Sequence, residues 1–358
     1  MRHYIIPIFI PHFGCPHHCI FCNQRKITGV ETTITPEHIA ELLDVHLQGI
    51  TRPYEVEAAF YGGSFTALSM ELQRKLLAPA AARLRQKSSE RGNLPARIDS
   101  IRLSTRPDYI NEEILAMLWQ NGVRTIELGA QSFAEQVLER AERAHTAEDI
   151  REAAGKIRAA GFQLGIQLMP GLPGEDEASL AFSLQQTLAL RPDLVRIYPT
   201  LVIRDTKLAE LYETGCYVPL SLEQAVGITA KMKRAFDRAG IEVIRMGLQS
   251  APELDRAGTV LAGPYHPAFG ELVESRIFYD GIESRLRSMG DLSGKVVLHH
   301  APQDTSQVRG LRNRNLKAWQ QQYPEASFCF IPDGKTRGEV CIAYGSLWYT
   351  IHNDRYDG

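Results

Sequence analysis

The sequence contains no hydrophobic run long enough to cross a bilayer, because its early apolar stretch at residues 4–10 is too short and continues into a cysteine-rich loop. It also lacks internal repeats, low-complexity segments and the pattern of a signal peptide. Its formal net charge is only -2, which argues against a protein that is basic over its whole surface. A nucleic-acid contact would therefore depend on a local basic patch.

Cysteine is scarce and unevenly distributed. Of the six cysteines, three are Cys15, Cys19 and Cys22, and the other three are scattered over the second half of the chain. This distribution does not match the disulfide framework of a secreted domain. The spacing C-x₃-C-x₂-C instead predicts a metal centre held by one loop.

Three thiolates this close together can hold three irons of a [4Fe–4S] cluster and leave the fourth iron without a protein ligand. A structural zinc site normally shows two separated ligand pairs and a closed shell, so zinc or three unrelated thiols is the alternative. We expect the fourth iron to bind S-adenosylmethionine (SAM) through its amino and carboxylate groups. Electron transfer to the sulfonium would then release a 5′-deoxyadenosyl radical. A low-potential cluster needs a reducing compartment, so we expect a cytoplasmic protein that does not contact a membrane.

The cysteine run resembles the cluster loop of the radical SAM superfamily, which reads C-x₃-C-x-aromatic-C. Phe21 fills the aromatic place directly before Cys22. The resemblance implies a [4Fe–4S] cluster and SAM as cofactors. It also implies an electron donor such as a flavodoxin or a ferredoxin.

Short apolar runs alternate with amphipathic stretches. Strand-like runs lie near residues 4–10, 56–61, 100–104, 124–129, 162–168 and 193–198. Helical segments between them have plausible N-caps at Thr35, Ser69, Asn111 and Thr146. This alternation implies a parallel sheet with right-handed crossovers. We predict an α/β fold: a partial six-stranded parallel (βα) barrel of radical SAM type, with its chemistry at the carboxyl ends of the strands.

The pattern changes in the C-terminal third. A helix at 221–239 and a strand at 242–246 follow the barrel. Further strand-like runs at 295–300, 327–331 and 339–343 flank a helical segment near 308–322. We therefore expect a radical SAM core over residues 1–245 and a small C-terminal α/β extension over 246–358 that contacts a substrate or partner, with the boundary falling somewhere within 245–290.

The second predicted strand ends in Tyr61-Gly62-Gly63-Ser64. Paired glycines let the backbone approach a ligand closely. In radical SAM enzymes a Gly-Gly-acidic motif at this place binds the methionyl amino group, and here Ser64 replaces the acidic residue. The contact with SAM would then be largely through the main chain. A tight turn is the alternative interpretation.

Other strand ends supply further candidates for the SAM pocket. Arg106 suits bidentate recognition of the methionyl carboxylate, although the segment could also be a turn that leads into a helix, with Asp108 as a local cap. Gln131 could line the pocket or lie in a simple turn. Gln167 is polar within an apolar strand and needs a partner if it is buried. The backbone at Ile197 and Tyr198 could meet the adenine.

Taken together, several strings resemble the radical SAM half of the elongator catalytic subunit over roughly residues 1–245. They are TRPDY at 105–109, GAQS at 129–132, LMPGLP at 168–173 and RIYPTLVIR at 196–204. That family modifies wobble uridines of tRNA with an acetyl group delivered by an acetyltransferase domain.

Residues 307–312 only half-match an acetyl-CoA phosphate loop, because Arg312 stands where a small residue is needed. We expect no acetyl-CoA chemistry and no full acetyltransferase domain. Oxygen-independent coproporphyrinogen oxidases are a more distant resemblance.

The leading functional hypothesis is a radical SAM enzyme that reductively cleaves SAM at a [4Fe–4S] cluster to act on an organic substrate such as a tRNA nucleoside. Two alternatives are radical chemistry on a small metabolite or tetrapyrrole, and a non-enzymatic iron–sulfur regulatory protein that binds SAM. The sequence identifies no catalytic residue. His266 and Glu271, in an unusual Pro- and Gly-rich loop, are candidates for proton transfer or substrate binding, and a purely structural loop is the alternative.

A basic segment formed by Arg309, Arg312, Arg314 and Lys317 is the local patch that a tRNA substrate would require. Its spacing could place several positive charges on one side of a helix. An ordinary solvated helix face is the alternative.

Overall fold

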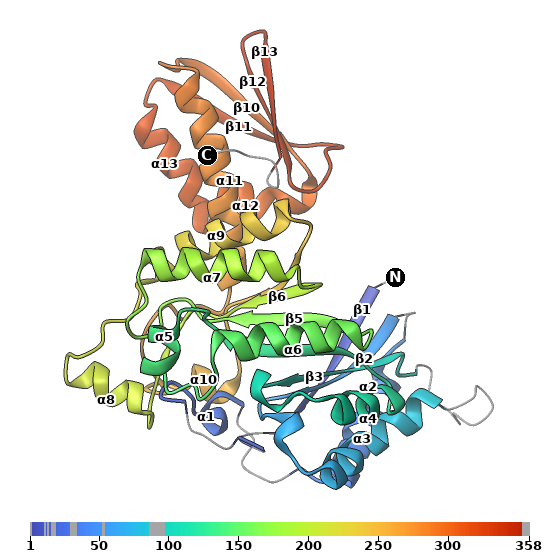
Figure 1. Cartoon of the computed structure of the whole chain (residues 1–358). Coiled ribbons are helices and arrows are strands. Elements are labelled where there is room, and N and C mark those ends of the chain that lie inside the picture. The colour runs from blue at the N-terminus through green and yellow to red at the C-terminus, as the bar shows by residue number, and fades with distance from the viewer. Residues whose placement is uncertain are drawn as a thin grey trace. The chain divides into compact units, whose positions relative to one another are not determined.

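The structure is a computed structural model that describes residues 2–10, 12, 14–15, 19–28, 34–51, 54–85 and 97–352. The chain divides into two compact units. The first comprises residues 1–220 and 249–263, and the second comprises residues 221–248 and 264–358. Figure 1 traces the elements of both units along the chain. Within the described residues, no helix is both long and apolar enough to cross a membrane.

A parallel sheet forms the centre of the first unit. Its strands are β1 (Arg2–Phe9), β2 (Tyr54–Tyr61), β3 (Ser100–Thr105), β4 (Val123–Gln131), β5 (Gln163–Leu168) and β6 (Leu194–Ile197). These strands pair in sequence order, each parallel to the next. The sheet order continues to a seventh strand, β8 (Glu242–Met246). The predicted α/β partial barrel is confirmed. The sheet has one strand more than expected, because the sequence pattern placed residues 242–246 after the barrel.

Helices connect the strands, as the alternating pattern predicted (Figure 1). They are α2 (Pro36–Gly49), α3 (Met70–Arg85), α4 (Glu112–Gln120), α6 (Ala147–Ala159) and α7 (Glu177–Leu190), with the shorter α1 (Gln24–Thr28), α5 (Glu135–Arg140), α8 (Lys207–Glu213) and α10 (Pro252–Asp255). The four predicted caps are confirmed, since the side chains of Thr35, Ser69, Asn111 and Thr146 each accept a backbone N–H of the first helical turn. A two-stranded antiparallel ribbon joins β7 (Val202–Ile203) and β9 (Val260–Ala262).

The second unit is a four-stranded sheet with helices. Its elements are α9 (Leu222–Arg238), α11 (Phe269–Ser288), β10 (Gly294–His300), α12 (Thr305–Arg309), α13 (Arg314–Gln322), β11 (Ala326–Pro332), β12 (Glu339–Tyr344) and β13 (Leu347–His352). The strand order is β11-β10-β12-β13. Trp319 is fully buried in its core and stacks on Tyr279, with ring centroids 5.6 Å apart. The sequence predicted α9, β8, β10, β11 and β12 closely, but α11 and β13 were missed.

The barrel sheet is tightly packed at Gly165 in β5. A Cβ atom there would lie 2.6 Å from Leu194 Cδ1 and 2.7 Å from Glu127 Cγ. By contrast, a Cβ atom at Gly155, in the middle of α6, would have nothing within 4 Å among the described residues. Glycine is therefore required by space in β5 but not in α6.

This contrast predicts opposite effects of one substitution at two sites. Gly165→Ala should lower the free energy of unfolding by about 1–3 kcal/mol, because it overpacks the sheet. Gly155→Ala should raise it by roughly 1 kcal/mol, because alanine favours an exposed helix interior over glycine. Urea unfolding of the apo protein measures both. A Gly165→Ala protein as stable as wild type would show that the packing at β5 is misjudged.

Candidate functional site

The cysteine loop directly follows β1, as the predicted barrel requires. Cys15, Cys19 and Cys22 are all partly buried and free of disulfides. The Cys22 amide donates to the Cys19 carbonyl (3.1 Å), and Cys19 and Cys22 pack against an apolar cluster that includes Phe21. The neighbouring His17 and His18 lie outside the described residues.

The three sulfurs interact electrostatically. Burial, and after it the charges of Cys19 and Cys15, raises the pKa of Cys22 to about 12, while the charge of Arg143 works in the opposite direction. Among the described residues, no three His, Cys, Asp or Glu side chains are grouped so that they could hold one metal ion.

The glycine pair after β2 lies against the cysteine loop. Ser64 is buried, and its hydroxyl lies 3.6 Å from Cys15 Sγ. Gly14 has φ +73°, and a Cβ atom on it would come within 2.4 Å of the Ser64 carbonyl oxygen. Gly62 has φ +102°, a conformation that favours glycine. The structure thus brings the predicted Gly62-Gly63-Ser64 motif next to the predicted cluster ligand Cys15.

Arg106, at the end of β3, is 3% exposed. Its Nε and Nη2 donate to the two carboxylate oxygens of Asp108 at 3.0 and 2.9 Å. Burial works against its charge, but Asp108, followed by the charges of Cys19 and Cys15, leaves the pKa raised. The third nitrogen of its guanidinium group, Nη1, is buried and has no hydrogen-bond partner among the described residues. Asp108 therefore pairs with Arg106 rather than capping the turn that follows β3, and one buried donor of Arg106 remains for an anionic group.

Gln131 and Gln167 contact each other across β4 and β5. The Gln167 Nε2 donates to Gln131 Oε1 at 3.0 Å, which supplies the partner that a buried glutamine needs. Gln131 has φ +70°, so its backbone leaves the strand in a left-handed conformation. At the end of β6, Ile197 is fully buried and the Tyr198 amide donates to the Leu168 carbonyl at 2.8 Å. The roles of these residues in the SAM pocket stay predictions.

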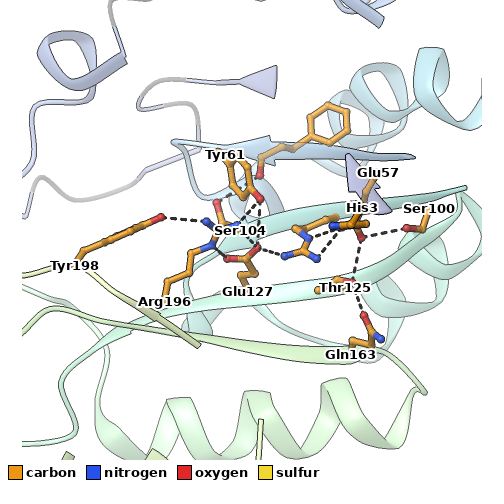
Figure 2. A network of polar contacts seen from close by, with 12 residues as sticks. His3, Glu57, Tyr61, Ser100, Ser104, Thr125, Glu127, Gln163, Arg196 and Tyr198 are labelled. Atoms are coloured by element: carbon orange, nitrogen blue, oxygen red, sulfur yellow. Dashed lines mark hydrogen bonds and ion pairs between the residues drawn. The ribbon is translucent and has the colours of Figure 1, made fainter. Parts of the chain in front are cut away.

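A chain of buried charges crosses one face of the sheet, as Figure 2 shows. Arg102 binds Glu57 at 2.7 Å and Glu127 at 3.0 Å, and Glu127 in turn binds Arg196 at 2.5 Å. His3 contacts Glu57 at 3.2 Å. The four side chains at the centre of this chain are at most 12% exposed. Acidic and basic groups alternate along it, so each buried charge faces an opposite one.

Arg196 connects these buried ion pairs to two of the predicted pocket residues, Tyr61 and Tyr198. Its Nη2 donates to the Tyr61 hydroxyl at 2.6 Å, and its Nη1 donates to the Tyr198 hydroxyl at 3.2 Å (Figure 2). Burial and the charge of Glu127 raise the pKa of Tyr61, so its phenol stays protonated. The sequence placed Tyr61 and Tyr198 in the site but not the arginine that orients them.

The connection from α5 to α6 supplies two further residues that the sequence analysis missed. Arg143 donates to Cys19 Sγ at 3.0 Å and to the Gly129 carbonyl at 2.6 Å. His145 is buried, with Nε2 3.2 Å from the Ala130 carbonyl. Burial, together with the charges of Arg143 and Arg106, lowers the pKa of His145 to about 2, so the ring is neutral. No motif signalled these contacts, because the residues lie more than a hundred positions from the cysteines.

Comparison with known families agrees with this geometry. Residues 9–187 match the radical SAM superfamily, and residues 192–278 match the Radical_SAM C-terminal domain. The chain belongs to the radical SAM superfamily. It is therefore an enzyme of that superfamily, and the expected cofactors, a [4Fe–4S] cluster and SAM, are those that radical SAM proteins bind.

The radical SAM core has relatives of known name. The tRNA uridine(34) acetyltransferase of Methanocaldococcus jannaschii is 28% identical over 251 residues, which are 61% of this chain and 46% of the relative. Elongator complex protein 3 of Danio rerio is 30% identical over 261 residues, 62% of this chain and 47% of the relative. The chain spans about half the length of these curated relatives. The resemblance to the elongator radical SAM region is thus confirmed.

A solved archaeal structure has the same fold. Elp3 of Methanocaldococcus infernus, lacking its N-terminal residues 1–46, superposes with a TM-score of 0.59 at 21% identity, covering 80% of this chain and 64% of that one. At this level of identity the likeness concerns the fold alone.

A pocket of about 400 Å³ lies in the first unit, beside the loop after β5 and the ends of α5 and α8. Within it, the Gly171 amide donates to Glu175 Oε2 at 2.5 Å, and the Tyr217 hydroxyl donates to the Gly171 carbonyl at 2.6 Å. Burial raises the pKa of Glu175 to about 7. No motif in the sequence indicated this pocket, because its polar groups meet only after the loop has folded back.

The two candidate catalytic residues lie in the second unit. His266 Nδ1 accepts the Ala268 amide at 3.1 Å, just before α11 begins. Glu271, in the first turn of α11, accepts a long hydrogen bond of 3.5 Å from the Ser306 hydroxyl. Local contacts therefore explain the position of His266, and a catalytic role for either residue stays a prediction.

The charge chain of the radical SAM core predicts a stability effect. Glu127→Ala should lower the free energy of unfolding by about 3–5 kcal/mol, because it leaves the guanidinium groups of Arg102 and Arg196 buried without their shared carboxylate. Urea unfolding of the apo protein measures the decrease. Glu139→Ala, at an exposed position on α5, is the matched control and should stay within about 0.5 kcal/mol of wild type. Equal stability of both variants would contradict the role given to Glu127.

Proposed function

We propose that this radical SAM enzyme binds one [4Fe–4S] cluster through Cys15, Cys19 and Cys22 and reductively cleaves SAM to act on a tRNA nucleoside. The observation that carries the first part is the C-x₃-C-x₂-C loop, which follows β1 and packs on the Gly62-Gly63-Ser64 segment that follows β2. The second part is supported by the names of the curated relatives, tRNA uridine(34) acetyltransferase and Elongator complex protein 3.

Cys15, Cys19 and Cys22 would hold the [4Fe–4S] cluster, which would supply the one-electron reduction that cleaves SAM. This chain's residues would position that reaction. Gly62 and Gly63 offer backbone groups to the methionyl amino group, and the buried Arg106 Nη1 offers a donor to its carboxylate. Ile197 and Tyr198 would lie toward the adenine. A small electron carrier such as a flavodoxin or ferredoxin would reduce the cluster, and the need for a reducing environment supports a cytoplasmic location.

The C-terminal part, residues 246–358, is proposed to contact the substrate. Its basic segment is partly engaged, because Arg314 binds Glu223 at 2.5 Å and Arg309 binds Asn313 at 3.0 Å. Arg312 and Lys317 are exposed. These two residues are therefore the better candidates for phosphate contacts.

The cluster assignment predicts that Cys15→Ala, Cys19→Ala and Cys22→Ala each abolish SAM cleavage, because loss of one thiolate exposes an iron and destabilises the cluster. The measurements are iron content after anaerobic reconstitution and 5′-deoxyadenosine formation under reducing conditions. Cys216→Ala, at an exposed cysteine, is the matched control and should keep both. Stoichiometric zinc in the wild type, with no iron-linked paramagnetic signal on reduction, would contradict the assignment of the three cysteines to an iron–sulfur cluster.

The SAM pocket predicts a different pattern. Gly63→Val should block SAM binding while iron content stays near normal, because a side chain would occupy the space of the methionyl group. Arg106→Ala should weaken SAM binding by about 1–3 kcal/mol, the range for one charge-assisted hydrogen bond. Calorimetric titration of SAM into the reconstituted protein measures both. Wild-type affinity in both variants would mean that the pocket lies elsewhere.

The tRNA proposal predicts salt-sensitive binding. Arg312→Ala combined with Lys317→Ala should weaken tRNA binding and lower the salt slope of log K by about 0.7–0.9 for each phosphate that the protein no longer neutralises. The control, Lys231→Ala combined with Lys295→Ala, removes the same charge from two other exposed positions of the second unit. SAM cleavage without substrate should persist in both. A wild-type protein without salt-sensitive tRNA binding would contradict the tRNA proposal and favour the alternative of a small metabolite or tetrapyrrole.

A further inference from the structure

The segment between α5 and α6 holds the cysteine loop at two points. The Ile20 amide donates to the Ala141 carbonyl at 3.3 Å, and the Arg143 guanidinium donates through Nη1 to Cys19 Sγ at 3.0 Å. The sulfur contact is short for a hydrogen bond to sulfur. Cys19 thus receives a hydrogen bond from a cationic side chain.

Arg143 is held rigidly in this position. Its own amide donates to the Leu138 carbonyl at 2.9 Å, and its Nη2 donates to the Gly129 carbonyl at 2.6 Å. The preceding residue, Glu142, has φ +52° and forms an ion pair with Lys207. The guanidinium is therefore fixed from the main chain of two separate elements, so its direction does not depend on the sulfur it touches.

The two arginines near the cysteines differ in their electrostatic partners. Both nitrogens of Arg106 that have a partner bind the Asp108 carboxylate, which offsets its charge. No carboxylate is paired with Arg143 in the part of the chain that the structure describes, and its Nε is buried without a partner there. Arg143 thus places a positive charge on the cysteine loop that is not paired with a carboxylate of the described residues.

Hydrogen bonds to the ligand sulfurs and nearby charge are two of the factors that set the reduction potential of an iron–sulfur cluster. A cation that donates to a ligand sulfur stabilises the reduced, more negative cluster relative to the oxidised one. We propose that Arg143 is a positioning residue that fixes Cys19 and raises the reduction potential of the cluster. This inference rests on the proposed function, because it requires Cys19 to ligate iron.

The test is a redox titration of the reconstituted full-length chain, followed by electron paramagnetic resonance. Arg143→Met removes the charge and the donors while keeping the length of the side chain. At the potential where half of the wild-type cluster is reduced, we expect the ratio of reduced to oxidised cluster to fall about tenfold, equivalent to ~59 mV for one electron. Arg143→Lys should recover part of this decrease, because it keeps the charge.

Arg158→Met, at an exposed position of α6, is the matched control and should leave the midpoint at the wild-type value. A fully loaded Arg143→Met protein with the wild-type midpoint and g values overturns the inference. If that variant does not retain iron, Arg143→Gln replaces it. Glutamine removes the charge and keeps N–H donors, so a lowered midpoint supports the contribution of the charge and an unchanged midpoint contradicts it. A wild-type chain that binds no cluster would refute the proposed function instead, before Arg143 is tested.

Discussion

Glu127 is the buried charge on which the barrel depends most. Its carboxylate is shared by Arg102 of β3 and Arg196 of β6, at 3.0 and 2.5 Å, so it ties together strands on both sides of β4. Through Arg196 the same contact orients the hydroxyl groups of Tyr61 and Tyr198 at two strand ends. A buried ion pair contributes little net stability when it is complete, but removing one partner is costly. The chain of charges therefore specifies how the strands must meet rather than adding strength to the sheet.

Much of the fold could be predicted from the sequence, because most of its strands and helices have recognisable local sequence patterns. Near-continuous apolar runs indicated the six parallel strands, and Thr35, Asn111 and Thr146 marked helix starts that the structure confirms. The helix α11 and the strand β13 were missed. The helix α11 contains Gly270 and Gly281, which lower the helix propensity of its sequence. The strand β13 covers residues 347–352, close to the C-terminal end of the sequence, where no strand was predicted.

The candidate site could be predicted only where its residues are neighbours in sequence. The cysteine spacing and the Gly62-Gly63 pair were visible as motifs. The contact of Arg143 with Cys19 was not visible, because it joins two loops that are 124 residues apart in the chain. The ion pairs of Glu127 were not visible either, because they join side chains of different strands that meet only in the folded sheet. A charged residue within an apolar strand, such as Glu127, was the available sign. It indicates that a buried partner must exist without identifying it.

The proposed chemistry requires the cysteine loop to present an iron that SAM can reach. Electron paramagnetic resonance of the reduced, reconstituted chain, recorded with and without SAM, examines that requirement without an added substrate. We expect a [4Fe–4S] signal whose g values change when SAM is added, because SAM becomes a ligand of the iron that has no cysteine. A cluster signal that stays unchanged at SAM concentrations that saturate binding would contradict this expectation.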